Sequence, residues 1–118
     1  MNLLVCGSRV GFTKEDVFKE LDKFKDNIDV VIHGGAVGVD SFAEEWCKLN
    51  NVKSNIVRPK NVSNKIDYLF RNCVMIGRAD KIIAFWDGKS KGTKFTWDYA
   101  CHFSLLGYMI ELEGIKDD

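Results

Sequence analysis

Short apolar runs alternate along the chain with longer segments in which apolar residues recur three or four positions apart. The short runs predict strands, and the longer period predicts amphipathic helices. We expect strands over residues 2–6, 29–33, 53–58, 81–86 and 108–112, and helices from about residue 13, over 39–50, after residue 64 and over about 93–106. This alternation is typical of successive βαβ units. The predicted fold is therefore α/β, a Rossmann-like three-layer sandwich with a parallel sheet of about five strands.

Each of the first three helical segments carries an apolar stripe that is expected to face the sheet. The stripes are Val17, Leu21 and Phe24; Phe42, Ala43, Trp46 and Leu49; and Ile66, Leu69, Phe70, Cys73 and Ile76. Thr13 has the side chain of a helix N-cap, and Gly107 is expected just past the end of the last helix.

Length and composition indicate one soluble globular domain over residues 1–118, with 46% hydrophobic and 29% charged residues. Basic and acidic side chains both number 17. Because there is no overall positive charge to hold a polyanion, general nucleic-acid binding is disfavoured, although the composition does not exclude a local basic patch.

The amino-terminal apolar run is too short for a signal segment, and no stretch is long enough to span a membrane. Four scattered cysteines, Cys6, Cys47, Cys73 and Cys101, have apolar neighbours and no metal-ligand spacing. We expect buried free thiols in a reducing cytoplasm.

Three strand ends carry glycine-rich loops, over residues 7–9, 34–40 and 87–93. In a parallel sheet these loops open on the same edge, where ligands bind. Glycine allows close backbone approach, and the helix starts that follow are anion sites. A further pair, Arg71 and Asn72, lies on the third helix, where a solvent-facing arginine and a phosphate contact are both open readings. The candidate ligand-binding residues are Gly7, Ser8, Arg9, Gly34, Gly35, Ala36, Gly38, Asp40, Arg71, Asn72, Asp87, Gly88, Ser90, Gly92 and Thr93.

Two familiar phosphate motifs are absent. A P-loop ending in residues 88–90 would need glycine at position 83, where Ile83 stands, and no G-x-G-x-x-G follows the first strand. His33 and His102 have no evident carboxylate or nucleophile partner, so structural roles are favoured for both. Trp86 could stack on a base or pack in the core, and Trp97 could pack in the core or at a subunit contact.

Taken together, the segments 7–9, 34–40, 71–75, 84–88 and 90–93 resemble the YspA-type branch of the SLOG superfamily, in order over about residues 3–112. The resemblance implies a Rossmann-like fold, a pocket for nucleotides or nucleotide-derived molecules, and frequent dimers. Relatives include the LONELY GUY phosphoribohydrolases and DNA-processing proteins that protect single strands. By position it places the three loops and the Arg71–Asn72 pair around one pocket, with residues 88–93 as the phosphate loop.

One departure bears on catalysis. The phosphoribohydrolase signature P-G-G-x-G-T-x-x-E ends in a catalytic glutamate, and Thr96 stands at that position here. Asp40, Asp87 or Asp98 could substitute, but nothing in the sequence places one at a scissile bond. We therefore favour a protein that is not an enzyme and expect no catalytic residue, cofactor or metal.

The favoured function is a module that senses, carries or sequesters a nucleotide or nucleotide-derived ligand, such as an ADP-ribose-like or cyclic nucleotide signal. The alternatives are a nucleoside-monophosphate N-glycosidase and, second, single-stranded nucleic-acid binding, which zero net charge disfavours. The expected partners are the small molecule and, from the resemblance and the aromatic load of the last helix, a second copy in a homodimer or larger homo-oligomer. Neither a membrane nor nucleic acid is an expected partner.

Overall fold

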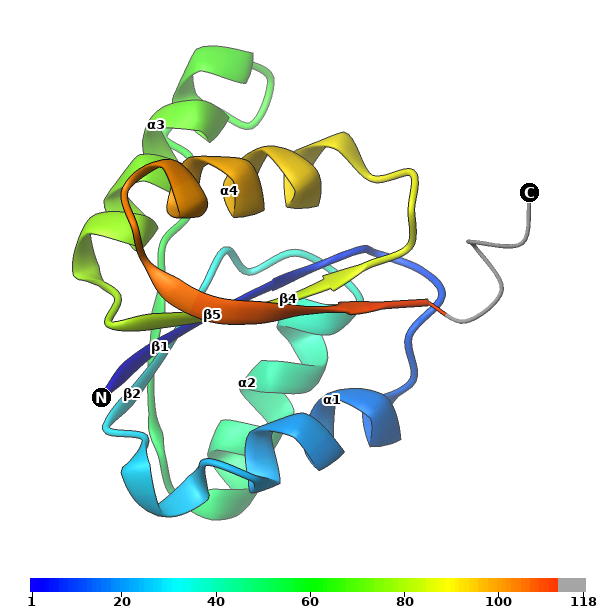
Figure 1. Ribbon diagram of the computed structural model, residues 1–118. Coiled ribbons are helices and arrows are strands. Elements are labelled where there is room, and N and C mark those ends of the chain that lie inside the picture. Colours follow the sequence, from blue (N-terminus) through cyan, green and yellow to red (C-terminus); the bar gives the residue numbers. More distant parts are fainter. Residues whose placement is uncertain (113–118) are drawn as a thin grey trace.

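The computed structural model describes residues 1–112, and these form a Rossmann-like α/β sandwich (Figure 1). The elements in chain order are β1 (Asn2–Gly7), α1 (Lys14–Asp22), the short 3-10 helix η1 (Lys25–Asn27), β2 (Val30–His33), α2 (Val39–Asn50), β3 (Lys53–Ile56), α3 (Lys65–Arg78), β4 (Lys81–Trp86), α4 (Lys91–His102) and β5 (Leu106–Glu111). The predicted fold class and element order are confirmed, with shifts of a few residues at several ends.

The five strands are all parallel and lie in the order β3-β2-β1-β4-β5. The central strand β1 pairs with β2 through Leu4 and Ile32 and with β4 through Leu4 and Ile82. Strand order therefore reverses at β1. In open α/β sheets a crevice forms outside the carboxyl ends of the strands at such a reversal.

Helices α1 and α2 cover one face of the sheet, and α3 and α4 cover the other (Figure 1). Alternation along β1 divides its side chains between the two layers, because successive residues of a strand point to opposite faces. Leu3 and Val5 pack in the core with Trp46 of α2, whereas Leu4 and Cys6 pack with Met75 of α3. Both layers are apolar, as a sheet with both faces covered requires.

The start of α1 is fixed as predicted. Thr13 accepts a hydrogen bond from the Asp16 backbone N–H, and the Asp16 carboxylate accepts one from the Thr13 N–H in return. This reciprocal capping box satisfies two backbone donors at the amino terminus of the helix.

The predicted end of the last helix is wrong. Helix α4 ends at His102, and Ser104, not Gly107, is the residue just past the helix that takes the left-handed conformation (φ 60°). Gly107 lies inside β5, where a Cβ atom would collide with the Ile82 carbonyl of the neighbouring strand. Glycine is therefore present for close strand approach and not for a helix cap.

Several apolar positions predicted to face the sheet do not. Leu49 is 70% exposed, Ile66 72% and Phe70 70%, and the first turns of α3 extend beyond the sheet (Figure 1). Helical period predicts which residues share a face, but it does not show whether another element covers that face. The expectation of buried cysteines is likewise met at only two positions. Cys6 and Cys47 are buried, whereas Cys73 is partly exposed and Cys101 is exposed.

Aromatic side chains of α4 pack partly on one another. The rings of Phe95 and Tyr99 lie 5.6 Å apart, and those of Tyr99 and Phe103 lie 4.9 Å apart. The expected homodimer stays a prediction. Within residues 1–112, no helix combines the length and the apolar character that crossing a bilayer requires.

Two glycines give a matched test of this packing. Gly77 lies near the end of α3 with no atom within 4 Å of its would-be Cβ, so Gly77→Ala should raise the free energy of unfolding by about 0.5 kcal/mol through helix propensity. Gly107→Ala should lower it by about 2 kcal/mol, because β5 must move away from β4. Urea denaturation of both variants measures these changes, and equal effects would contradict the assigned strand approach.

Candidate functional site

A cavity of about 490 Å³ opens at the carboxyl edge of the sheet, between the turns after β1 and β2 and the helices α3 and α4. Ten of the predicted ligand-binding residues line it: Gly7, Arg9, Gly34, Ala36, Asp40, Arg71, Asn72, Ser90, Gly92 and Thr93. The other five, Ser8, Gly35, Gly38, Asp87 and Gly88, lie in the same loops but do not line it.

Ser8 joins the two central strands instead of facing the cavity. It is buried, its backbone N–H donates to the Phe85 carbonyl at 2.9 Å, and its hydroxyl accepts from the Asp87 N–H at 3.0 Å. Asp87 in turn accepts the N–H groups of Lys89 and Ser90, both at 2.8 Å. Slight burial opposes ionisation of Asp87, but these donors outweigh it and lower its pKa. The two residues therefore shape the loop after β4.

Gly38 and Gly35 have steric roles. Gly38 begins α2 with φ 82°, and a Cβ there would lie 2.5 Å from the Arg9 carbonyl oxygen. Gly35 has φ 73°, and its carbonyl accepts a hydrogen bond from Arg58 Nη1 at 3.3 Å. Both positions favour glycine, because left-handed backbone is costly for other residues. Gly88, with φ 87°, turns the loop after β4.

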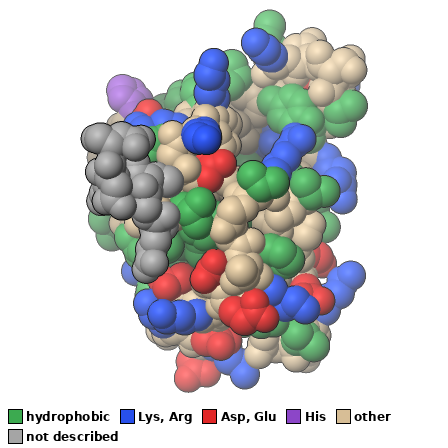
Figure 2. All heavy atoms as spheres, turned by 90° about the vertical axis from the view of Figure 1, so that its right-hand side faces the viewer, with side chains coloured by type: hydrophobic (Ala, Val, Ile, Leu, Met, Phe, Trp, Pro, Cys, Tyr) green, Lys and Arg blue, Asp and Glu red, His purple; other side chains and the backbone are tan. Residues whose placement is uncertain are grey.

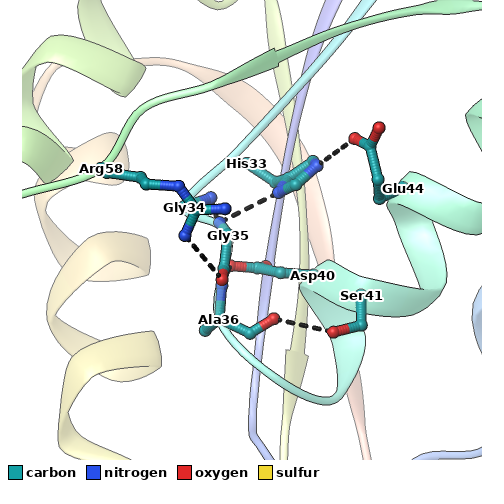
Figure 3. Close-up of polar contacts among 8 residues, drawn as sticks. All are labelled: His33, Gly34, Gly35, Ala36, Asp40, Ser41, Glu44 and Arg58. Atoms are coloured by element: carbon teal, nitrogen blue, oxygen red, sulfur yellow. Dashed lines mark hydrogen bonds and ion pairs between the residues drawn. The ribbon is translucent and has the colours of Figure 1, made fainter.

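The turn after β2 is held by Asp40, which lies in the first turn of α2. Its Oδ2 atom accepts the backbone N–H groups of Gly34 at 3.1 Å and Ala36 at 3.2 Å. Figure 3 shows the Asp40 side chain directed at this turn, with Ser41 bonded to the Ala36 carbonyl. Burial raises the pKa of Asp40, although the two amides and the charge of Arg71 oppose the shift.

His33 supports the same turn from behind. Its Nδ1 atom accepts the Gly35 N–H at 3.0 Å, so the ring proton is on Nε2, which donates to Glu44 Oε1 at 2.8 Å (Figure 3). The structural role predicted for His33 is confirmed, but the absence of a carboxylate partner is wrong. Glu44 lies eleven residues away in sequence and is brought to His33 by the packing of α2 on β2.

Arg71 is bonded within the protein instead of facing solvent, and the phosphate contact stays a prediction. It is partly buried, and its Nη1 atom donates to the carbonyls of Gly34 at 2.9 Å and Val57 at 3.1 Å. Its Nε atom donates to Asn72 Oδ1 at 2.9 Å. Burial lowers the pKa of Arg71, while the nearby Asp40 works to raise it. The guanidinium thus connects α3 to the turns after β2 and β3 and forms one wall of the cavity.

The start of α4 forms the opposite wall. Ser90 is its N-cap, and the Ser90 hydroxyl donates to Thr93 Oγ1 at 3.1 Å. Thr96 lines the cavity, and its hydroxyl donates to the Gly92 carbonyl at 3.0 Å. Trp86 is held by a bond from its Nε1 to the Ser90 carbonyl at 3.0 Å, so it braces the loop.

The sequence analysis missed eight lining residues: Cys6, Lys65, Tyr68, Leu69, Met75, Lys91, Phe95 and Thr96. Lys65, Tyr68, Asn72 and Met75 follow one another at intervals of three or four residues, so they share one face of α3. The sequence analysis instead took a neighbouring stripe of this helix as the face that packs on the sheet, namely Ile66, Leu69, Phe70, Cys73 and Ile76. Among residues 1–112, no group of three or more His, Cys, Asp or Glu side chains is placed to hold a metal ion.

Charge is distributed unevenly over the molecule. The four connections that follow β1 to β4 carry Arg9, Arg58, Lys60 and Lys89 but only one acidic side chain, Asp87. Figure 2 views this edge and shows Lys and Arg side chains around a hollow in its upper part, while most acidic side chains lie lower down, towards α1 and α2. The zero net charge therefore conceals a basic edge.

Glu44→Gln tests the support of the β2 turn. Partial burial opposes ionisation of Glu44, but hydrogen bonds from His33 and Ser54 and the charge of Lys48 outweigh it and lower its pKa. At pH values above 4.5, the ordinary pKa of a glutamate, the ionised form of Glu44 therefore stabilises the folded protein. This stabilisation is lost as the pH falls through the lowered pKa of Glu44. The variant should be about 1 kcal/mol less stable at neutral pH and should match the parent in acid. Urea denaturation from about pH 7 to about pH 3 measures the difference. A difference that does not vary with pH would contradict the hydrogen bond from His33 to an ionised Glu44.

Two solved structures share the fold. The DNA processing protein A of Streptococcus pneumoniae superposes with a TM-score of 0.83 over 98% of this chain and 52% of its own, at 19% identity. The DNA processing protein A of Helicobacter pylori, described by its single-stranded DNA binding mode, gives 0.75 over 92% and 64%, also at 19% identity. At this identity the likeness shows the fold, and the chain spans less than two thirds of either neighbour.

These neighbours contradict the favoured function and the expected partners. The small nucleotide-derived ligand and the expectation that nucleic acid is not a partner are contradicted, and the second alternative, single-stranded nucleic-acid binding, is better supported. The error has a physical origin, because nucleic acid was disfavoured on the charge summed over the chain, whereas binding depends on charge at the site.

The resemblance on which the sequence analysis relied is confirmed. A comparison with curated protein sequences gives no match. A profile of the YspA, cpYpsA-related SLOG family matches residues 1–61, which contain β1, β2, β3 and the first two of the three glycine-rich loops. The match covers half of the chain, and the fold agrees with it. The chain belongs to the YspA, cpYpsA-related SLOG family.

Proposed function

We propose that this domain binds single-stranded DNA at the carboxyl edge of its sheet. The observation that carries the proposal is the charge of the cavity. Four cationic side chains line it, Arg9, Lys65, Arg71 and Lys91, against one carboxylate, Asp40. Contacts of this kind with phosphates supply most of the affinity of proteins for nucleic acid.

The start of α4 adds to this field. Lys91 is its first residue, and its first turn contains no acidic side chain. A lysine at a helix amino terminus is unfavourable for the helix, because the macrodipole is positive there. An anion at this position would offset the repulsion between the Lys91 ammonium group and the positive end of the helix. It would also accept hydrogen bonds from the free backbone N–H groups of the first turn. The arrangement therefore favours a phosphate near Lys91.

Aromatic rings occur beside the charges. Tyr68 and Phe95 both line the cavity, and the guanidinium of Arg71 lies 5.2 Å from the centre of the Tyr68 ring. Sites for single strands combine a basic groove with aromatic side chains on which bases stack, and stacking tolerates any sequence. In a duplex the faces of the bases are already covered, so this composition favours a single strand.

The shared fold supports the same proposal. One neighbour is described by its single-stranded DNA binding mode, and in this chain the basic cavity lies where strand order reverses. Because the chain spans only part of either neighbour, the proposal concerns strand binding alone. The cytoplasm is the proposed compartment, since exposed Cys101 is a free thiol and thiols stay reduced there.

A double substitution tests the role of the basic cavity. Lys65→Ala with Lys91→Ala should weaken binding of a fluorescent oligo-dT strand about tenfold, because two phosphate contacts are lost. The slope of log affinity against log salt should become shallower by about 1.4. Fluorescence anisotropy over a salt series measures both quantities.

The matched control removes two lysines from the opposite edge. Lys25 and Lys53 are exposed and lie at η1 and at the start of β3. Lys25→Ala with Lys53→Ala makes the same change in net charge and should leave affinity nearly unchanged. Equal losses in the two double variants would mean that only overall charge matters, and no binding by the parent protein would refute the proposal.

Filling the cavity is an independent test. Gly92 lines it, and a Cβ at this position meets no atom within 4 Å. Gly92→Val should therefore preserve the melting temperature and reduce affinity for oligo-dT about tenfold, because the new side chain occupies ligand space. Gly77→Val is the control, since Gly77 is equally open on α3 but outside this cavity. Full binding by the Gly92 variant would place the strand elsewhere.

A further inference from the structure

The peptide unit that joins Gly34 to Gly35 is held from two sides by partners of opposite kind. Its N–H group, on Gly35, donates to His33 Nδ1 at 3.0 Å (Figure 3). Its carbonyl, on Gly34, accepts a hydrogen bond from Arg71 Nη1 at 2.9 Å. The orientation of this unit therefore depends on an acceptor at His33 and on a donor at Arg71.

The peptide units on either side are fixed independently. Asp40 Oδ2 accepts the Gly34 N–H, which belongs to the preceding unit, and the Ala36 N–H, which belongs to the following one. The carbonyl of that following unit, on Gly35, accepts from Arg58 Nη1 at 3.3 Å. Glycine stands at both ends of the central unit and tolerates the changes of φ and ψ that a rotation requires. The central unit can therefore turn over while its neighbours stay in place.

Protonation of His33 would remove the acceptor. The ring is 1% exposed and its Nε2–H already donates to Glu44 at 2.8 Å, so a second proton can only enter at Nδ1. An Nδ1–H would face the Gly35 N–H, and two donors cannot bond to each other. The Gly34 carbonyl, at the other end of the same unit, is the acceptor that the new N–H needs. Histidine gains its charge between about pH 5 and pH 8, which makes this exchange accessible near neutrality.

Two carboxylates of α2 lie beside the ring and favour its protonation. Glu44 is bonded to it, and Asp40 lies close enough for its charge and that of His33 to interact. The other ionisable groups near these carboxylates or near the turn are Lys48 of α2, Arg71 of α3, Arg58 after β3 and Cys6 of β1. Burial raises the pKa of the Cys6 thiol and keeps it neutral. The cations oppose protonation, whereas Glu44, the group bonded to the ring, favours it.

We propose that the Gly34–Gly35 peptide unit is a switch operated by a proton on His33. With neutral His33 the N–H of the unit lies on the ring and its carbonyl lies on Arg71. Protonation rotates the unit by half a turn, so that the carbonyl accepts from the His33 Nδ1–H and the N–H points towards Arg71. Hydrogen bonds are exchanged, no covalent bond changes, and Asp40 holds the two neighbouring units throughout.

The switched state changes the wall of the cavity, which Gly34 and Arg71 both line. The Gly35 N–H and the Nη1 hydrogen that Arg71 no longer gives to the carbonyl face each other, and both need an acceptor. A phosphate oxygen can bond to both, as anions do at sites built from backbone N–H groups. Proton uptake by His33 and phosphate binding therefore strengthen each other. This consequence rests on the proposed binding of single-stranded DNA, whereas the rotation itself does not.

Amide hydrogen exchange without DNA, in a buffer free of phosphate, tests the rotation alone. Between about pH 8 and about pH 5.5 the ring nitrogens of His33 should titrate in the NMR spectrum. The protection factor of the Gly35 amide should fall about tenfold over the same range, while the Gly34 and Ala36 amides keep theirs. Unchanged protection of Gly35 while His33 titrates would overturn the proposal, and so would a His33 that stays neutral in the folded protein.

His33→Asn removes the proton site and keeps the acceptor. An asparagine side-chain oxygen accepts the N–H two residues further on, as in an Asx turn, so the unit should stay in its neutral orientation. Protection of the Gly35 amide should then not vary with pH. His102→Asn is the matched control, because His102 is the other of the two histidines and is exposed. It should behave like the parent, and the same pH response in both variants would overturn the assignment to His33.

Fluorescence anisotropy with oligo-dT tests the consequence for binding. At constant salt, the affinity of the parent and of His102→Asn should rise about tenfold from about pH 8 to about pH 5.5, while that of His33→Asn should change little. Asp40 is present in all three proteins, so its own protonation cannot produce the difference. An equal rise in all three would overturn the coupling. Absence of binding by the parent at every pH would refute the proposed function, whereas amide exchange would still decide the rotation.

Discussion

Parallel pairing of β1 on both of its edges is the constraint on which the rest of the molecule depends. Because β2 lies on one side of β1 and β4 on the other, α1 and α2 cross one face of the sheet and α3 crosses the opposite one. The connections diverge at the carboxyl edge and leave a space between them. Ser8, which follows β1, joins this strand to the end of β4 through hydrogen bonds with the Phe85 carbonyl and the Asp87 N–H.

The cavity that results is stiff, because the groups that line it also hold its loops. Asp40 fixes the β2 turn through two amides, and Arg71 fixes the Gly34 carbonyl from the other side. His33 and Glu44 support the same turn from the core. A site held in this way needs little ordering when a ligand enters, which favours affinity. Among residues 1–112, Asp40 Oδ1 is the one buried polar side-chain atom that has no hydrogen-bond partner.

Electrostatics at this edge differ from those of the chain as a whole. Lysines stand at the first positions of α1, α3 and α4, all of which begin on the same side of the sheet. Lys14 is paired with Glu45 of α2 at 3.1 Å, whereas Lys65 and Lys91 line the cavity. Equal totals of acidic and basic residues thus coexist with a lining that carries four cationic side chains and one carboxylate. The local balance matters for a charged ligand, because screening limits the reach of charge to about 10 Å.

Much of the fold follows from local chemistry. Apolar strands, the Thr13 cap and the glycine-rich loops after three of the strands predicted the element order and the edge at which the cavity opens, because backbone preference and burial act over a few residues. The sequence also identified Arg9, Asp40 and Arg71. It could not show that Ser8 and Asp87 are used inside the protein or that Gly107 lies within a strand. Those outcomes depend on distances between elements far apart in the chain. Sequence period gives the direction of a side chain on its own helix or strand, and only the tertiary structure decided what lies opposite it.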